Sequence, residues 1–123
     1  MAITGPDFIA LQVRDLDKAA AFYETVVGLK RAPFSPPHAV VFDTQPTFAV
    51  REPAPGVDLE AGPAGLGVVL WMHDPEAVAL HDTVAAAGAV ITQAPFDGPF
   101  GTTFVFQDLD GYLVTVHDKA TRG

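Results

Sequence analysis

Cysteine is absent from the 123-residue chain, which therefore can form no disulfide and offers no thiolate as a nucleophile or metal ligand. Serine occurs once, as Ser35 in a proline-rich stretch, and this argues against a serine nucleophile. No apolar run approaches the roughly 18 residues that a membrane span needs. No basic segment followed by an apolar one indicates a signal peptide. We therefore expect a cytoplasmic protein that does not contact the membrane.

Basic residues are also scarce. Seven Lys and Arg residues stand against 15 Asp and Glu residues, which gives a formal net charge of −8. Nucleic-acid phosphates require a basic surface, so this balance argues against a nucleic-acid partner. The same charge favours a cationic small molecule. Hydrophobic residues make up 49% of the chain and charged residues 18%, which is enough for a packed core in a single domain.

The first half of the chain is predicted to contain four strands and one helix. Residues 7–13 alternate as a strand with Ile9 and Leu11 on its apolar face. A helix is expected to begin after Asp15 as its N-cap and to end at Gly28. Further strands are predicted over residues 29–34, 38–43 and 47–52, the first of them stopped by prolines.

The second half repeats this order after a linker rich in proline and glycine over residues 53–65. A strand is predicted over residues 66–72. Asp74 is then expected to cap a helix that ends at Gly88 and carries along its length Val78, Leu80, His81, Val84 and Ala85. A short strand at residues 90–93, a loop at 94–101 and a closing hairpin complete the half. The hairpin spans residues 104–117 and turns at residues 108–111.

The two halves match in spacing as well as in order. The two capping aspartates lie 59 positions apart and the two helix-ending glycines 60 positions apart. Such a period indicates two copies of one supersecondary unit. We predict an α+β fold in a single domain over residues 1–123. Two βαβββ modules, at about 1–55 and 66–123, are expected to form a curled eight-stranded mixed sheet with helices on its convex face and a cleft on its concave face.

Two motifs carry a resemblance to a known family. They are Val-Arg-Asp-Leu-Asp-Lys-Ala-Ala-Ala-Phe-Tyr-Glu-Thr-Val-Val-Gly-Leu at residues 13–29 and Phe-Gln-Asp-Leu-Asp-Gly-Tyr at residues 106–112. With the repeat, they make the chain similar, over nearly its whole length, to the vicinal oxygen chelate superfamily of glyoxalases, bleomycin-resistance proteins and extradiol dioxygenases. Its single-module members usually form homodimers with clefts near the subunit interface, so the resemblance implies a homodimer here.

The resemblance also bears on metal binding. Enzymes of this family hold a divalent metal with one ligand from each of four strands. The matching positions here fall on Phe8, nearest Ala49, on Gly67 and on Thr115. Phe8, Gly67 and Thr115 are poor ligands for Zn²⁺, Fe²⁺, Mg²⁺ or Mn²⁺. The resemblance therefore implies no metal and no cofactor, as in the metal-lacking bleomycin-resistance branch.

Strand alternation selects candidate ligand-binding residues on the cleft face. They are Phe8, Gln12, Arg51, Trp71, Thr115 and His117. The resemblance adds the loop residues Phe34 and Phe100 as aromatic walls. Aromatic walls suit a flat ligand, because stacking adds about 0.5–1.5 kcal/mol beyond area burial.

Alternatives stay open at six of these positions. Core packing is the alternative for the four aromatic residues Phe8, Phe34, Trp71 and Phe100. His117 is either a ligand hydrogen bonder or general base, or an exposed histidine at the end of a strand. Arg51 pairs either with an anionic group of the ligand or with Asp43.

These observations favour a small-molecule-binding protein. We expect it to sequester a hydrophobic or cationic natural product in the aromatic cleft without a metal, as a drug-resistance or carrier protein, and we assign no catalytic residue. The alternative is an enzyme of the same superfamily, a lyase, isomerase or dioxygenase with an atypical metal site or none. His117, Gln12 and Arg51 are its candidate groups. A third possibility is a structural or regulatory module without a ligand.

Overall fold

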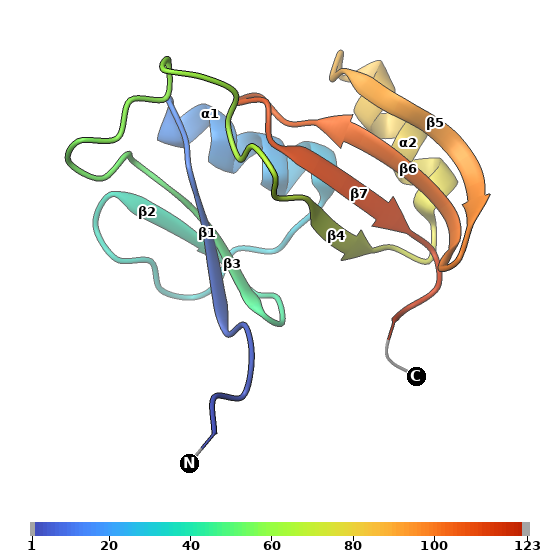
Figure 1. Cartoon of the computed structure of the whole chain (residues 1–123), viewed down its shortest axis with the longest axis horizontal. Coiled ribbons are helices and arrows are strands. Elements are labelled where there is room, and N and C mark those ends of the chain that lie inside the picture. The colour runs from blue at the N-terminus through green and yellow to red at the C-terminus, as the bar shows by residue number, and fades with distance from the viewer. Residues whose placement is uncertain (1, 122–123) are drawn as a thin grey trace. The chain divides into compact units, whose positions relative to one another are not determined.

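The computed structural model describes residues 2–121 and divides the chain into two compact units, Met1–Ala61 and Gly62–Gly123. Each unit contains one mixed sheet and helical segments (Figure 1). The first sheet has three strands in the order β1-β3-β2, and the second has four in the order β4-β7-β6-β5. No helix within residues 2–121 has the length and apolar character needed to cross a bilayer.

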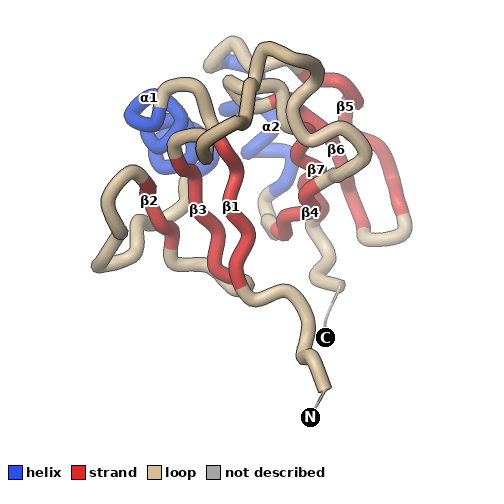
Figure 2. The backbone as a smooth tube through the Cα atoms, turned by 60° about the vertical axis from the view of Figure 1, so that its left-hand side comes forward, coloured by secondary structure: helices blue, strands red, loops and turns tan. Residues whose placement is uncertain are grey.

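The first unit contains β1 (Phe8–Gln12), α1 (Leu16–Ala21), the π-helical segment η1 (Phe22–Val27), β2 (Ala39–Phe42) and β3 (Thr47–Arg51). Central strand β3 pairs with β1 in parallel and with β2 in antiparallel orientation. Figure 2 shows the three strands side by side. The predicted strands over residues 7–13, 38–43 and 47–52 are thereby confirmed in type and place.

The helix of the first unit begins and ends at the predicted residues. The Asp15 side chain accepts a hydrogen bond from the backbone N–H of Lys18 at 3.1 Å, which satisfies one of the free donors of the first turn. At the other end Gly28 has φ +93°, and its N–H donates to the Tyr23 carbonyl at 3.0 Å. A left-handed residue here is accessible to glycine at little cost.

The core of the first unit gathers around Tyr23 on η1. Its ring centroid lies 5.0 Å from that of Phe48 and 6.3 Å from that of Phe42. The two phenylalanines, on paired strands, stack with their centroids 6.0 Å apart. All three side chains are buried. The helical segments therefore cover the sheet face that carries Phe42 and Phe48.

The predicted strand over residues 29–34 is wrong. Only Arg31 pairs, through an isolated bridge to Phe42. Hydrogen bonds from Ala32 N–H to the Val41 carbonyl and from Asp43 N–H to the Lys30 carbonyl flank this bridge. The next residue, Pro33, has no N–H and cannot extend the ladder. The unit thus has three strands, and the structure contains sheets of three and four strands in place of the expected eight-stranded one.

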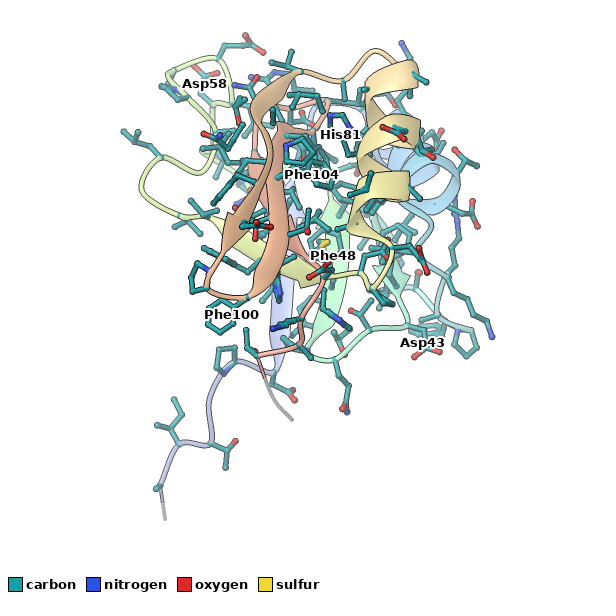
Figure 3. All side chains as sticks on the ribbon, turned by 90° about the vertical axis from the view of Figure 1, so that its right-hand side faces the viewer. Asp43, Phe48, Asp58, His81, Phe100 and Phe104 are labelled. Carbon is teal, nitrogen blue, oxygen red and sulfur yellow. The ribbon has the colours of Figure 1, made fainter. Side chains whose placement is uncertain are left out.

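The second unit contains β4 (Leu70–His73), α2 (Ala77–Ala86), β5 (Ile91–Gly98), β6 (Gly101–Gln107) and β7 (Leu113–His117). Helix α2 packs on β5 and β6 (Figure 1). On this side of the sheet, Phe104 stacks on Phe106 with centroids 6.0 Å apart. The His81 ring of α2 meets Phe104 edge-on at 5.3 Å, and the two point toward each other in Figure 3.

Strand β4 and helix α2 both begin later than predicted. Gly65 and Gly67 have φ +63° and +84°, left-handed values that interrupt the extended backbone, so β4 starts only at Leu70. Helix α2 has Glu76 as its N-cap, without a side-chain cap, because the Asp74 carboxylate accepts from the Glu76 N–H in a preceding turn.

Helix α2 buries Val84 but leaves Val78 exposed. Val78 is 52% exposed, and Ala77 and Val84 are its buried residues. The end of the helix is as predicted, because Gly88 has φ +88° and its N–H donates to the Ala85 carbonyl at 3.0 Å.

Strand β5 is twice as long as predicted, and the predicted loop at residues 94–101 is largely strand. The β5–β6 ladder shifts register between Ile91 and Gln93 and again before Phe96. Such irregularities admit a residue without an N–H, here Pro95.

The closing hairpin between β6 and β7 is confirmed. Its turn is fixed by Gly111 at φ +93° and by the Asp108 carboxylate, which accepts from two backbone N–H groups at 2.9 Å.

Candidate ligand-binding face

The sheet face opposite α2 in the second unit carries a cluster of rings, which we call the outer ring face: Trp71, His73, Phe100 and His117. Parallel pairing of β4 and β7 places Trp71 opposite Thr115 and His73 opposite His117. Directly paired residues project to the same side of a sheet. Two adjacent strands thus present three of the rings together.

His117 lies at the centre of the outer ring face. Its ring centroid is 5.7 Å from Trp71, 5.8 Å from Phe100 and 5.9 Å from His73. Trp71 and Phe100 also meet, edge to face, at 6.1 Å. His117 is 2% exposed, whereas Trp71 is 52% and Phe100 37% exposed. The cluster therefore surrounds a buried imidazole with two large rings that remain accessible.

Phe100 reaches this face from the turn between β5 and β6 (Figure 3). Its carbonyl accepts a hydrogen bond from the Lys119 N–H at 3.0 Å. The neighbouring Thr102 N–H donates to the Asp118 carboxylate at 2.9 Å. Between them Gly101 has φ +84°, and a Cβ there would collide with the Asp118 carboxylate. The backbone after β7 therefore fixes the turn that carries Phe100.

The same C-terminal backbone orients both histidines. His117 Nδ1 lies 2.7 Å from the Lys119 carbonyl oxygen, and His73 Nε2 lies 3.2 Å from the Asp118 carbonyl oxygen. Because a carbonyl oxygen only accepts, each of these nitrogens is the donor. The reading of His117 as an exposed strand-end residue is wrong, since its side chain is buried and held in one orientation.

The predicted site residues fall into two groups. Trp71, Phe100 and His117 are in mutual contact in the second unit, and Thr115, 4% exposed, lies opposite Trp71. Sequence reasoning placed His73 at the surface, and it is indeed exposed, but its membership of the cluster was missed. Its position two residues after Trp71 on one strand is the signal that places it on the same face.

The other predicted residues belong to the first unit. Phe8 and Phe34 are 53% and 74% exposed, so core packing is excluded for both. The Gln12 side chain accepts from the Ala54 N–H at 2.7 Å. Arg51 Nε donates to the Glu52 carbonyl at 2.9 Å.

The positions that the resemblance assigns to metal ligands do not supply a suitable donor set. Phe8 and Ala49 carry a phenyl and a methyl group, and Thr115 a hydroxyl group. Gly67 lies before β4 at φ +84°, outside the strand on which it was expected. Carbon side chains cannot coordinate a divalent cation. Within residues 2–121, no three His, Asp or Glu side chains are grouped so as to hold a metal ion.

Negative charge is concentrated in the half of the chain that bears the outer ring face. Residues 62–123 include seven acidic and two basic side chains, which account for five of the eight net negative charges. A field of this sign raises the local concentration of cations and speeds their association.

Comparison with known proteins identifies the family. Residues 5–116 match the model of the Glyoxalase/Bleomycin resistance protein/Dioxygenase superfamily. The chain therefore belongs to this superfamily, as the two sequence motifs predicted. No match is found among curated proteins.

Solved structures share the fold at low sequence identity. TnmS3, an antibiotic binding protein from Streptomyces sp. CB03234, is 20% identical with a TM-score of 0.74, over 98% of this chain and 99% of that one. TioX from Micromonospora sp. ML1 is 22% identical with a TM-score of 0.70, over 94% and 100%. A glyoxalase-related enzyme from Fulvimarina pelagi is 19% identical with a TM-score of 0.74, over 94% and 88%. The fold is thus shared by an antibiotic-binding protein and by an enzyme.

Proposed function

We propose that this protein binds a flat aromatic small molecule, hydrophobic or cationic, on the outer ring face and sequesters it without a metal. The observation that carries the proposal is the exposure of two contacting rings, Trp71 at 52% and Phe100 at 37%. Exposed aromatic groups gathered at one place mark ligand or partner sites more often than isolated ones do. The protein is then of the drug-resistance or carrier type, and its ligand is a natural product.

Charge and kinship support the same class of ligand. The excess of five negative charges in residues 62–123 favours an aromatic cation over an anion, and an indole face such as that of Trp71 attracts cations further. TnmS3, which shares the fold, is an antibiotic binding protein. Flat aromatic cations are therefore the first ligands to test.

The remaining predicted residues and the homodimer belong to this proposal. We propose Thr115 and His117 as contacts beneath the ligand on the outer ring face, and we retain Phe8, Gln12, Phe34 and Arg51 as proposed ligand-binding residues of the first unit. The homodimer is supported by a run of exposed apolar side chains ahead of edge strand β4, where Leu66 is 81% and Val68 64% exposed. Sedimentation equilibrium at micromolar concentration tests it, and a monomer contradicts it.

Titration calorimetry with 10-methylacridinium, a flat aromatic cation, tests the proposed binding. We expect Trp71→Ala and Phe100→Ala each to weaken its binding about tenfold or more, as truncation of an aromatic anchor does. Val78→Ala is the matched control, because Val78 is equally exposed but lies on α2. Unchanged affinity in both aromatic variants, or no binding by the wild type, contradicts the proposal.

One observation favours the enzyme alternative. Two imidazoles, His73 and His117, stand in register with their N–H groups held by carbonyl oxygens, an arrangement also found around metal-ligating histidines. Elemental analysis of the purified protein separates the alternatives. A tightly bound transition metal at one per chain supports the enzyme and contradicts sequestration without a metal.

A further inference from the structure

A row of three polar side chains crosses the outer face of the second sheet. Thr103 on β6 is paired with His117 on β7, and His117 is paired with His73 on β4. Direct pairing places the three side chains on one side of the sheet as immediate neighbours. Thr103 and His117 are each 2% exposed, and His73 is exposed. The row thus leads from a buried polar end to an open one, alongside the exposed rings.

Each member of this row donates its hydrogen to a main-chain carbonyl. The Thr103 hydroxyl donates to Gly101 at 3.0 Å, His117 Nδ1 to Lys119 at 2.7 Å, and His73 Nε2 to Asp118 at 3.2 Å. In the uncharged side chains, the atoms that then offer a lone pair are Thr103 Oγ1, His117 Nε2 and His73 Nδ1. The row therefore presents acceptors and no donor.

Nε2 of His117 is the acceptor at the centre of the rings. It has no hydrogen-bond partner among the residues that the structure describes. In the same residues, no buried side-chain nitrogen or oxygen is left without a partner. Nε2 therefore belongs to the small part of the His117 side chain that remains accessible, beside Trp71 and Phe100.

We infer that His117 determines the specificity of the outer ring face. Its Nε2 accepts a hydrogen bond from the ligand, so that the face selects flat aromatic compounds with an N–H or phenolic O–H at the ring edge. This inference rests on the proposed binding function. A ligand without a donor leaves a desolvated acceptor unpaired and loses affinity for that reason.

A metal ion also accepts lone pairs, but the row suits it less well. Two imidazoles and a hydroxyl include no carboxylate or thiolate, and no third His, Asp or Glu joins them within residues 2–121. Divalent cations in proteins are held by three or more such ligands as a rule. An organic donor needs only one well-placed acceptor, and His117 supplies it.

A matched pair of carbolines tests the inference by titration calorimetry. Norharmane and 9-methylnorharmane are both flat, and they differ in one group, N–H against N–CH₃. We expect the wild type to bind norharmane about tenfold more tightly, as one hydrogen bond at a desolvated site provides. In His117→Phe, which keeps a ring but has no lone pair, the two affinities should become equal. His81→Phe, on the α2 side of the sheet, should keep the tenfold preference.

The outcomes separate this inference from the proposed function. If 10-methylacridinium binds the wild type but the two carbolines bind equally, only the inference is overturned. If His117→Phe still prefers norharmane over 9-methylnorharmane, the preference has a steric origin and the inference is overturned as well. A preference of the wild type that disappears when EDTA removes metal ions also overturns the inference. If circular dichroism shows that His117→Phe does not fold, nitrogen-15 NMR of the wild type replaces it. Norharmane, but not 9-methylnorharmane, should then shift the Nε2 resonance of His117, and an Nε2 resonance that responds equally to both compounds overturns the inference.

Discussion

The two units of this protein share the parallel pairing of their first and last strands but distribute their aromatic rings differently. In each, a first strand lies parallel to the last one, β1 to β3 and β4 to β7. In each, a stacked phenylalanine pair with a centroid distance of 6.0 Å lies under the helix. On the opposite sheet face, the first unit pairs Ala10 with Ala49, whereas the second pairs His73 with His117 and adds Trp71.

This difference separates residues that hold the fold from residues available for binding. The stacked pairs recur in both units and are buried, as the core of any such sheet must be. The cluster of contacting outer rings lies in the second unit, where Trp71 and Phe100 are accessible, whereas the first unit exposes Phe8 on the same side of β1 as Ala10. Sheets with the same aromatic packing on the helix side thus carry outer faces of different composition.

The largest expected effect comes from a ring on the helix side. Phe104→Ala should lower the free energy of unfolding by about 3–5 kcal/mol, because it leaves a cavity in a fully buried stack. Trp71→Ala should lower it by less than about 1 kcal/mol, since half of that side chain is already in water. Urea denaturation followed by circular dichroism measures both values. Equal losses of unfolding free energy in the two variants would show that Trp71 belongs to the core and would contradict the division into core rings and binding rings.

A smaller effect is expected from the glycine beside Phe100. Gly101→Ala introduces a Cβ that collides with the Asp118 carboxylate and also strains a backbone at φ +84°. We expect a loss of about 2–3 kcal/mol together with weaker binding of 10-methylacridinium, because the turn must move.

Gly111→Ala is the control for this change, with φ +93° but no atom within 4 Å of the added Cβ. Its backbone strain alone should cost about 1 kcal/mol and leave binding unchanged. Binding that is impaired to the same degree in both variants would show that the effect does not come from the Asp118 contact.

The smallest effect distinguishes the starts of the two helices. Asp15→Ala removes a side-chain cap from α1 and should cost about 1 kcal/mol. Glu76→Ala, at the N-cap of α2, should change stability by only a few tenths of a kcal/mol, because Glu76 makes no capping hydrogen bond. Thermal unfolding of both variants measures the difference. A larger shift for Glu76→Ala would contradict the assignment of the two caps.

Local signals in the sequence predicted much of the fold. Alternation identified β1, β2, β3 and β7, and Asp15, Gly28 and Gly111 have the roles that their chemistry predicted. The failures involve backbone geometry that a pattern does not contain. Gly67 turns left-handed ahead of β4, whereas Pro95 is tolerated inside β5 by a register shift. Neither the left-handed backbone at Gly67 nor the register shift in β5 can be read from the alternation of residue types.

The candidate site was partly predictable for a similar reason. Alternation placed Trp71 and His117 on one face, because side-chain direction follows from strand phase. The contact of Phe100 with both rings depends on a hairpin turn fixed by the Lys119 backbone, which is remote in sequence from Trp71. The tautomer of His117 depends on the backbone carbonyl oxygen of Lys119, so it cannot be predicted from the types of the neighbouring residues.

Lys119 shows that a position can matter for the site through its backbone alone, so that its residue type need not be conserved. Its N–H and carbonyl hold Phe100 and His117, and neither bond uses its side chain. Almost any amino acid other than proline preserves both hydrogen bonds, so the residue type at position 119 can vary during evolution. Related chains with a different residue at this position can therefore keep the same imidazole orientation. The side chain of residue 119 can likewise be exchanged by mutagenesis without changing the positions of Phe100 and His117.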